Sequence, residues 1–290
     1  MQTKHQIQQL LTSAGLKPNK RLGQHFLIDL NLMRLLVDSA DIRNDDIVLE
    51  VGCGTGSLTE VLVQKAGRVI AVEYDHNLAE IAKIQLSNAD NLEIFNADIL
   101  KNKNTINNTI TNIIKSAKEL FTGRFMLVSN LPYNVASAVM MNFITGPTVS
   151  DCMYVTVQKE VANRMTATPG THDYGKLSIL LQAAGEIRKI RTLKPTVFWP
   201  QPQVDSAMVG FIRNNEKTAR IKNIELFEKI VDLFMGHRRK TLSATGKLEH
   251  DKFPTCIDWP VIFQKSHINP AKRPENLTYE EYITLSNSVK

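Results

Sequence analysis

Short apolar runs alternate with amphipathic segments along the first two thirds of the chain. Apolar, β-branched runs occur at residues 47–52, 68–75, 92–98, 125–130 and 153–158. Runs of this length and composition are typical of buried strands. Segments with helical spacing follow at residues 57–66, 76–86, 136–145 and 159–166. The alternation predicts an α/β fold with a mostly parallel, doubly wound sheet that has helices on both faces.

The pattern changes toward the C-terminus. A last strand pair is predicted at residues 186–194 and 204–212, and helical apolar stripes follow at residues 223–235 and 279–289. We therefore predict two domains, with a boundary near residues 213–216. Residues 1–214, including a basic N-terminal arm at 1–28, form the larger domain, and residues 215–290 form a small all-α domain. Segment 101–122 is rich in Asn, Lys and Thr, which predicts a poorly formed helix or a surface insertion.

Composition excludes several classes of protein. The 290 residues are 43% hydrophobic and 22% charged, which is ordinary for a folded soluble chain and excludes a disordered or fibrous one. Lys and Arg exceed Asp and Glu by 35 to 29, and this net charge of +6 permits a nucleic-acid partner. Cys53, Cys152 and Cys256 are too few and too far apart for a disulfide framework or a cysteine zinc site.

The sequence contains no segment that is suited to span a membrane or to direct export. No apolar run approaches the roughly 18 residues of a membrane-spanning helix, and the N-terminal residues lack the pattern of a signal peptide. We expect a cytoplasmic protein that has no membrane partner and holds no metal.

A glycine-rich loop follows the first predicted strand and opens a helix. Gly52, Gly54 and Gly56 form a Gly-x-Gly-x-Gly pattern, at the place where α/β sheets bind nucleotide-like cofactors. The spacing differs from the Gly-x-Gly-x-x-Gly of dinucleotide binders. No Lys or Arg stands in the loop to meet a pyrophosphate. By itself the pattern also fits a plain turn between a strand and a helix.

Two carboxylates stand at the ends of the next two predicted strands. Glu73 is placed to accept hydrogen bonds from both hydroxyls of a ribose. Asp98 is placed to accept one from the exocyclic amine of an adenine. Either residue alone also fits a helix cap. Together with the glycine loop they predict an adenosine site without a phosphate cradle, which favours S-adenosylmethionine over NAD.

The tetrapeptide Asn130-Leu131-Pro132-Tyr133 follows the fourth predicted strand. A side-chain amide oxygen and a neighbouring backbone carbonyl both accept hydrogen bonds from an NH₂ group, and an aromatic ring stacks on a base. The motif thus predicts recognition of an adenine that has been turned out of its stack. Phe198, in a proline-rich loop, is a candidate for the ring on the other face of that base, although core filling also explains it.

These motifs resemble the KsgA-type ribosomal RNA adenine dimethyltransferases, which form two adjacent N6,N6-dimethyladenosines in small-subunit RNA. The resemblance covers nearly the whole chain and rests on residues 21–27, 50–56, 73, 97–98, 130–135, 157–165, 174–178, 198–207, 237–242 and 268–282. It implies the Rossmann-like fold of class I S-adenosylmethionine-dependent methyltransferases, with a small all-α C-terminal domain.

The resemblance also implies roles for individual residues. Those implied to bind S-adenosylmethionine are His25, Leu27, Gly52, Glu73, Asp98 and Asn130, with Gln24, Gly54 and Gly56 beside them. Those implied to form the target-base site are Asn130, Leu131, Pro132 and Tyr133, with Phe198 as the opposing ring. Residues 21–27 would fold over the cofactor. The implied reaction, attack of adenine N6 on the cofactor's methyl group, depends mainly on positioning, so no catalytic His, Lys or Ser is assigned.

The implied substrate is 16S rRNA, within the small ribosomal subunit or its precursor. Two adjacent adenosines in a 3′-terminal hairpin would be methylated by a monomeric enzyme that also takes part in subunit biogenesis. The candidate RNA-binding residues are Arg21, Arg238, Arg239 and Lys240. Cations near the C-terminal end of a helix are also stabilised by the helix dipole, without any contact with RNA. Arg188, Lys189, Arg191 and Lys194 form a second basic stretch.

Three alternatives stay open at this point. An Erm-type enzyme, which methylates large-subunit RNA, shares the fold and the Asn-x-Pro-Tyr motif, but residues 198–207 and the C-terminal motifs favour the small-subunit enzyme. A non-catalytic ribosome-assembly factor is a second alternative, and the intact cofactor and acceptor motifs argue against it. An NAD-dependent oxidoreductase is the third, and its glycine spacing is absent.

Overall fold

The computed structural model describes residues 1–19, 22–102, 105–248 and 257–289. The strands are β1 (Phe26–Leu27), β2 (Ile47–Val51), β3 (Arg68–Glu73), β4 (Leu92–Asn96), β5 (Leu100–Asn102), β6 (Thr105–Ile106), β7 (Phe125–Asn130), β8 (Cys152–Gln158), β9 (Gly185–Leu193), β10 (Phe198–Trp199) and β11 (Ser206–Arg213). The helices are α1 (Lys4–Ser13), α2 (Leu30–Ala40), α3 (Thr59–Leu62), α4 (His76–Gln85), α5 (Asn108–Leu120), α6 (Ala136–Thr145), α7 (Lys159–Thr166), α8 (Lys176–Ala184), α9 (Asn215–Ala219), α10 (Ile224–Gly236), α11 (Leu242–Gly246), α12 (Trp259–Lys265) and α13 (Tyr279–Ser288).

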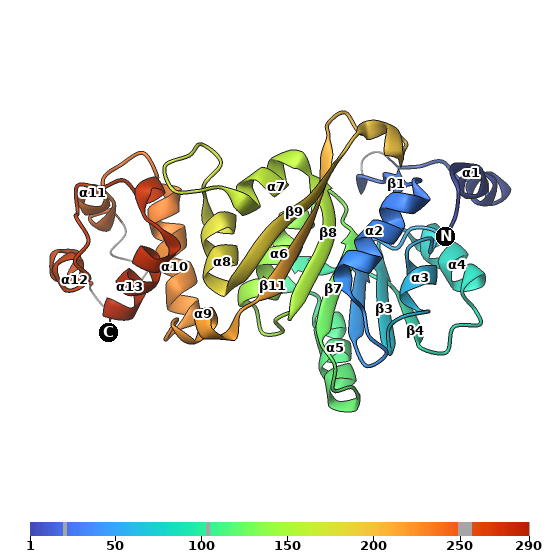
Figure 1. The fold of residues 1–290 in the computed structure, drawn as a ribbon, viewed down its shortest axis with the longest axis horizontal. Coiled ribbons are helices and arrows are strands. Elements are labelled where there is room, and N and C mark those ends of the chain that lie inside the picture. The colour runs from blue at the N-terminus through green and yellow to red at the C-terminus, as the bar shows by residue number, and fades with distance from the viewer. Residues whose placement is uncertain (20–21, 103–104, 249–256, 290) are drawn as a thin grey trace. The chain divides into compact units, whose positions relative to one another are not determined.

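One mostly parallel sheet organises the described chain. Its strand order is β4-β3-β2-β7-β8-β11-β9 (Figure 1). Strands β2, β3, β4, β7 and β8 pair in parallel, and β11 pairs antiparallel to β8. All five residues of β2 are buried because this strand has neighbours on both sides and helices on both faces. The prediction of a mostly parallel α/β sheet is confirmed.

The strand order reverses between β2 and β7. The chain moves outward from β2 to β3 and β4, and then returns to continue on the other side with β7 and β8. The loops that leave β2 and β7 therefore diverge at the same edge of the sheet. Such a switch point is where open α/β sheets hold their ligands.

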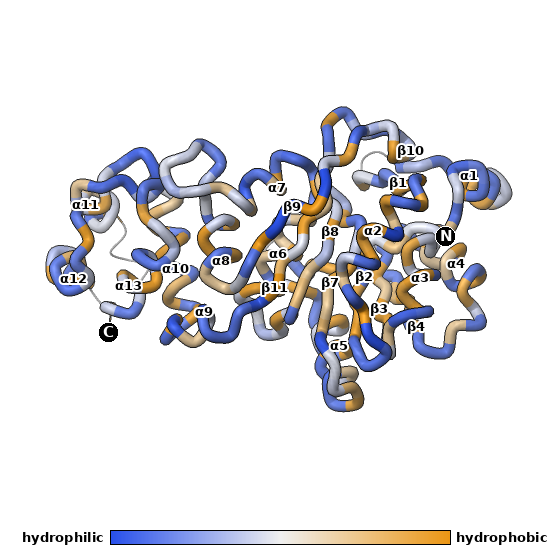
Figure 2. Tube along the Cα trace, in the orientation of Figure 1, coloured by the Kyte–Doolittle hydropathy of each residue, from blue (hydrophilic) through white to orange (hydrophobic). Residues whose placement is uncertain are grey.

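Helices cover both faces of the sheet. Residues of α2 join Val48, Val69 and Met126 of three strands in one buried apolar cluster. Phe125 precedes Met126 and so faces the other way, where its ring meets that of Phe143 on α6. The hydropathy tube shows the same arrangement, because the central strands are largely apolar along their length (Figure 2).

Two segments are more ordered than their composition suggested. The basic N-terminal arm contains α1, whose Ile7 and Leu11 are buried against Leu78 of α4. Within segment 101–122, α5 is a regular helix that buries Ile110 and Ile114. The sequence pattern indicates these two helices only weakly, because their apolar stripes are short and the residues around them are polar.

The chain divides into two compact units. The first comprises residues 1–162 and 188–212, and the second comprises residues 163–187 and 213–290. The second unit is helical, as expected for residues 215–290, but it also includes α8, which packs on α10 and α13. The predicted boundary near residues 213–216 assigns residues 163–187 to the larger domain, whereas the structure groups them with the second unit. In the part of the chain that the structure describes, no helix is long and apolar enough to cross a membrane.

Candidate active site

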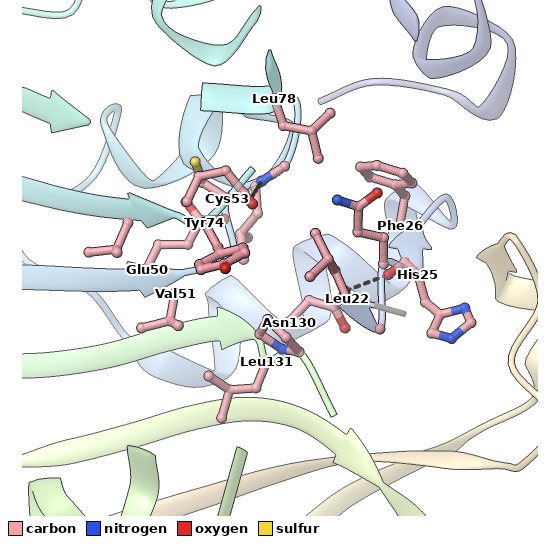
Figure 3. A pocket seen from close by; sticks show the side chains of 18 of the residues that line it. Leu22, His25, Phe26, Glu50, Val51, Cys53, Tyr74, Leu78, Asn130 and Leu131 are labelled. Carbon is pink, nitrogen blue, oxygen red and sulfur yellow. Dashed lines mark hydrogen bonds between the residues drawn. The ribbon is translucent and has the colours of Figure 1, made fainter. Parts of the chain in front are cut away.

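A pocket of about 310 Å³ opens where the loops after β2, β3 and β7 meet (Figure 3). Most of the predicted site residues line it: Gln24, His25, Leu27, Gly52, Gly54, Glu73, Asp98, Asn130, Leu131, Pro132 and Tyr133. These residues come from five separate stretches of sequence. The topology brings them together because parallel strands present their carboxyl ends at one edge.

The glycine loop passes very close to the loop after β7. Gly52 and Gly54 have φ angles of +78° and +59°, in the region that favours glycine. A Cβ atom on Gly52 would lie 2.7 Å from Cγ of Pro132. Only a residue without a side chain lets the predicted cofactor loop and the predicted acceptor loop approach this closely.

Glu73 holds the glycine loop to the end of β3. One carboxylate oxygen accepts a hydrogen bond from the Gly54 amide at 2.8 Å, and the other accepts one from the Asp75 amide at 2.9 Å. Burial raises the pKa of Glu73. Each carboxylate oxygen has a second lone pair, so the group keeps acceptor capacity for a ligand.

Two further predicted cofactor residues are positioned by hydrogen bonds. The Gln24 amide donates to Asp75 at 3.1 Å, and Asp75 also caps the start of α4. Asp98 is exposed at the pocket, and one of its carboxylate oxygens accepts from the Leu100 amide at 2.9 Å. Both contacts fix loops at the ends of β3 and β4.

Asn130 carries a buried acceptor atom. Its Nδ2 donates to the backbone oxygen of His25 at 2.9 Å, which fixes the orientation of the amide. Its Oδ1 is buried and has no hydrogen-bond partner within the described residues. Leaving such an atom unpaired costs roughly 1–3 kcal/mol. The arrangement suits a ligand that brings an N–H donor to this point.

Tyr133 and His25 form an ordered wall beside Asn130. Their rings stack with centroids 5.3 Å apart. The Tyr133 hydroxyl and the Ser206 hydroxyl share a hydrogen bond of 2.6 Å, and His25 Nδ1 lies 2.7 Å from the Pro200 carbonyl oxygen. Because a carbonyl only accepts, His25 carries a proton on Nδ1. Burial raises the pKa of Tyr133, so the phenol stays neutral.

Phe198 does not line the pocket. It is 1% exposed and belongs to the buried apolar cluster beneath α2. Strand β10 pairs with β1 so that Phe198 lies opposite Leu27, and Trp199 stacks on Phe26. The alternation of side chains along the strand directs Phe198 into the core, as the core-filling alternative predicts, and its stacking on the target base stays a prediction. Phe26, which was predicted only as part of segment 21–27, lines the pocket.

Gly56 also lies away from the pocket lining. Its φ is +85°, and a Cβ atom there would lie 2.9 Å from a methyl carbon of Leu86, just after α4. This glycine lets the loop pack against α4. Arg21, which was predicted to bind RNA, lies outside the described residues.

Several residues that line the pocket were not predicted from the sequence. Ile7, Glu50, Tyr74, Leu78 and Ile99 all line it. Tyr74 is 60% exposed, which is unusual for a large aromatic side chain and offers a flat apolar surface. Its position directly after Glu73 was a usable signal. Ile7 gave only a weak one, the helical spacing of Ile7 and Leu11.

The segment before α1 is attached to the glycine loop. The side chain of Gln2 donates to the Thr55 carbonyl at 2.9 Å and accepts from the Thr55 hydroxyl at 2.6 Å. The Gln2 backbone amide donates to the Ser57 hydroxyl at 2.8 Å. Since these contacts are buried, the N-terminal segment supports the loop that lines the pocket.

We expect Gln2→Ala to weaken binding of S-adenosylmethionine about three- to tenfold, because two buried hydrogen bonds to Thr55 are lost. Turnover at saturating cofactor should stay within twofold. Calorimetric titration of the two proteins measures the change. Gln9→Ala, at an exposed position on the adjacent helix α1, is the matched control, and equal affinities of the two variants would contradict this role for Gln2.

Glu50 is a fully buried carboxyl group beside the glycine loop. Burial raises its pKa from 4.5 to about 8, although the Thr59 hydroxyl donates to it at 2.6 Å. In the folded protein it is therefore protonated near neutral pH. Between pH 4.5 and about 8 the unfolded chain has lost this proton while the folded chain keeps it. Stability contributed by the group must then fall as pH rises through this window.

Glu50→Gln should remove that pH dependence and keep the acceptor for Thr59. We expect the variant to gain stability relative to the parent by up to roughly 1.4 kcal/mol for each pH unit above 4.5. Denaturant titrations at pH 5 and pH 8 measure the difference. A constant difference across this range would show that the Glu50 carboxyl titrates normally.

The predicted RNA-binding cations differ in their surroundings. Arg238 pairs with Glu275 at 2.9 Å and also donates to the backbone oxygens of His172 and Tyr174. Its guanidinium therefore ties together parts of the second unit. Arg239 and Lys240 are exposed.

In the described part of the chain no cluster of three or more His, Cys, Asp or Glu residues suits a metal ion.

Comparison with known proteins adds an independent line of evidence. A family model described as "Ribosomal RNA adenine dimethylase" matches residues 15–290. The chain is 36% identical over 293 residues to a "Ribosomal RNA small subunit methyltransferase A" of Geobacillus sp. strain WCH70, covering 99% of this chain and 97% of that protein.

Solved structures show the same fold. The chain is similar to a dimethyladenosine transferase from Plasmodium falciparum, with a TM-score of 0.70 and 24% identity over 89% of this chain and 94% of that one. It is also similar to the 23S rRNA methyltransferase ErmE, with a TM-score of 0.61 and 23% identity over 91% of this chain and 99% of that one. At these identities the likeness concerns the fold alone.

Proposed function

The chain belongs to the ribosomal RNA adenine dimethylase family of S-adenosylmethionine-dependent methyltransferases, and we propose that it dimethylates N6 of two adjacent adenosines in the 3′-terminal hairpin of 16S rRNA. The observation that carries the proposal is the buried, unpartnered Oδ1 of Asn130 beside the glycine loop. A buried acceptor at this place fits an exocyclic amine.

The pocket residues suit this cofactor. Glu73 retains lone pairs for the ribose hydroxyls, and Asp98 offers its carboxylate to the adenine amine. The exposed ring of Tyr74 and the side chain of Leu78 supply apolar surface for the base. Among the described residues that line the pocket there is no Lys or Arg, as expected for a ligand without a phosphate. When bound, the cofactor supplies a methyl group on a positively charged sulfur.

The chain's own part in the reaction is to position the target amine. Asn130 Oδ1 would accept a hydrogen bond from N6, and the Leu131 carbonyl would accept the second. These bonds favour a pyramidal nitrogen whose lone pair points away from both acceptors. The ring of Tyr133, which is held by a hydrogen bond to Ser206, would stack on the adenine. Well-oriented reactants gain roughly 7–11 kcal/mol, so no strong base is needed.

The choice of the small subunit is supported by the relative at 36% identity, whose name specifies that subunit. The 23% identity to ErmE carries no information on substrate. The motifs at residues 198–207 and 268–282 point the same way. On this proposal the protein works as a cytoplasmic monomer during small-subunit biogenesis, where a precursor still exposes the hairpin.

Methyl transfer from labelled S-adenosylmethionine tests the proposal. Small subunits that lack the modification, large subunits and protein-free RNA are offered in parallel. Label that appears as dimethyladenosine in small subunits alone is the expected result. Label in large-subunit RNA would transfer the assignment to an Erm-like activity. Tight small-subunit binding without transfer would instead indicate an assembly factor.

The two neighbouring arginines of the second unit should behave differently. Arg238→Ala is expected to cost about 1–2 kcal/mol of stability, because the Glu275 carboxylate and two carbonyl groups lose their donor. The exposed pair Arg239→Glu/Lys240→Glu should leave stability within about 0.5 kcal/mol and weaken small-subunit binding. Thermal unfolding and subunit sedimentation measure both effects. Unchanged subunit binding by the double variant would contradict an RNA role for this pair.

A further inference from the structure

Strand β9 is the outermost strand of the main sheet and carries an exposed row of cations. It pairs with β11 on one side, and within the described residues no strand pairs with its outer edge. Lys189, Arg191 and, just after the strand, Lys194 are all exposed. The hydropathy tube shows hydrophilic positions alternating with apolar ones along β9 (Figure 2). Figure 1 shows the strand leading toward β1 and β10.

Lys194 of this row pairs with Asp205 at 3.3 Å, whereas the other two cations, Lys189 and Arg191, have no such carboxylate partner within the described residues. The one acidic residue of β9, Glu186, pairs with Lys217 at 2.7 Å. Lys189 and Arg191 are two positions apart, so they point to the same face of the strand. The row therefore presents net positive charge to solvent.

Cations also lie near the acceptor site. Lys194 and Lys159 flank the Asp205 carboxylate at 3.3 and 3.5 Å, so this group of three keeps one net positive charge. The next residue, Ser206, makes the 2.6 Å hydrogen bond to the Tyr133 hydroxyl. Tyr133 lines the pocket beside Asn130. Cations therefore lie both on the sheet edge and next to the strand end that holds Tyr133.

We propose that Lys189, Arg191, Lys194 and Lys159 form a phosphate track that binds the backbone of the rRNA strand on one side of the target adenosine. This inference rests on the proposed function and adds a surface to it. At about 3.3 Å per residue, Lys189 and Lys194 are separated by roughly 17 Å along the chain, which is long enough to contact more than one phosphate. Contacts of this kind position the RNA and do not read its sequence.

Charge on an edge strand also has a simpler explanation, since cations there prevent strands of different molecules from pairing. That explanation requires no relation to the active site. The cations here extend beyond the strand to Lys194 and to Lys159 at the start of α7, next to the residues that hold Tyr133. An RNA strand entering the site accounts for both the strand and its continuation.

The double variant Lys189→Glu/Arg191→Glu tests the track, because neither residue contacts the pocket. Binding to unmodified small subunits should weaken about tenfold near 0.1 M salt, and the slope of log affinity against log salt should decrease by about two. KM for subunits should rise with kcat reduced less than threefold, and cofactor affinity should be unchanged. Lys83→Glu/Lys115→Glu makes the same charge change at exposed positions on α4 and α5 and is the matched control.

The outcomes separate this inference from the proposed function. If the parent protein methylates small subunits and the β9 variant binds them with unaltered affinity and salt slope, the track is wrong and the proposed function stands. Aggregation of the variant with normal RNA affinity would favour the edge-protection explanation. The neutral variant Lys189→Gln/Arg191→Gln, for which an intermediate loss is expected, decides the matter if the charge-reversed protein is insoluble. If the parent transfers no methyl group to small subunits, the proposed function itself fails.

Discussion

Asn130→Ala is expected to lower turnover by about 10²–10³-fold, the loss typical of removing one fixed polar group that acts on the reacting atoms. The variant loses Oδ1, a buried acceptor without a partner among the described residues, and also the bond from Nδ2 to the His25 carbonyl. Cofactor affinity should change by no more than about fivefold, the worth of one hydrogen bond. Single-turnover methylation and cofactor titration measure the two effects separately.

Two controls make the result specific. Asn91→Ala removes a side-chain amide that donates to the Val63 and Ala66 carbonyls, so it loses comparable bonds away from the pocket lining. It should cost stability and leave kcat unaltered. Asn130→Asp keeps an acceptor at the site and should retain more activity than Asn130→Ala. If Asn130→Ala stayed within tenfold of the parent, the acceptor role of Asn130 would be wrong.

Gly52→Ala should damage both cofactor binding and turnover. The new Cβ would lie 2.7 Å from Cγ of Pro132, and φ of +78° is itself unfavourable for alanine by roughly 1–2 kcal/mol. The glycine loop and the acceptor loop must then move apart. We expect cofactor affinity to fall more than tenfold and turnover more than a hundredfold, since a displacement near 1 Å is enough for such a loss.

Gly15→Ala is the matched control for backbone strain. Gly15 has φ of +67°, and its added Cβ would meet no atom within 4 Å. The control should lose stability only. The double variant Gly52→Ala/Pro132→Ala removes the overlapping atoms and should recover part of the cofactor affinity. If Gly15→Ala and Gly52→Ala had equal effects on cofactor binding, the close approach of the two loops would not matter.

Together the two variants separate the two halves of the site. Asn130→Ala should affect the chemical step with little effect on the cofactor, because its unpaired Oδ1 is the proposed acceptor for the target amine. Gly52→Ala should affect both, because Gly52 lies where the loops after β2 and β7 touch. The difference follows from the switch point in the strand order, which places both loops at one edge of the sheet.

Several site residues were predictable because they occupy fixed places in a local pattern. Glu73 ends an apolar strand and Asn130 ends another, and both indeed line the pocket. The burial of Phe198 was not predictable, for the opposite reason. Its neighbours in sequence are prolines and aromatics, so the sequence does not show which face of the short strand β10 turns inward. Pairing with β1 decides that, and it places Phe198 in the core.

Arg238 and Gln2 illustrate a second limit. A run of basic residues looks alike in sequence, yet Arg238 is occupied by Glu275 and two carbonyl groups whereas Arg239 is exposed. Gln2 carries no motif at all, and its partners Thr55 and Ser57 lie more than fifty positions away. Contacts between such distant positions leave no periodic trace in the chain.

The sequence alone determined the α/β class, the strands that end in chemically useful residues, and the family resemblance, because these depend on periodicity and on motifs of neighbouring residues. Only the tertiary structure decided the strand order, the inclusion of α8 in the second unit, the burial of Phe198, the support of the glycine loop by Gln2 and the row of cations on an edge strand. The physical reason is that burial and pairing are settled between segments far apart in the chain, where packing selects one partner among many with similar local patterns.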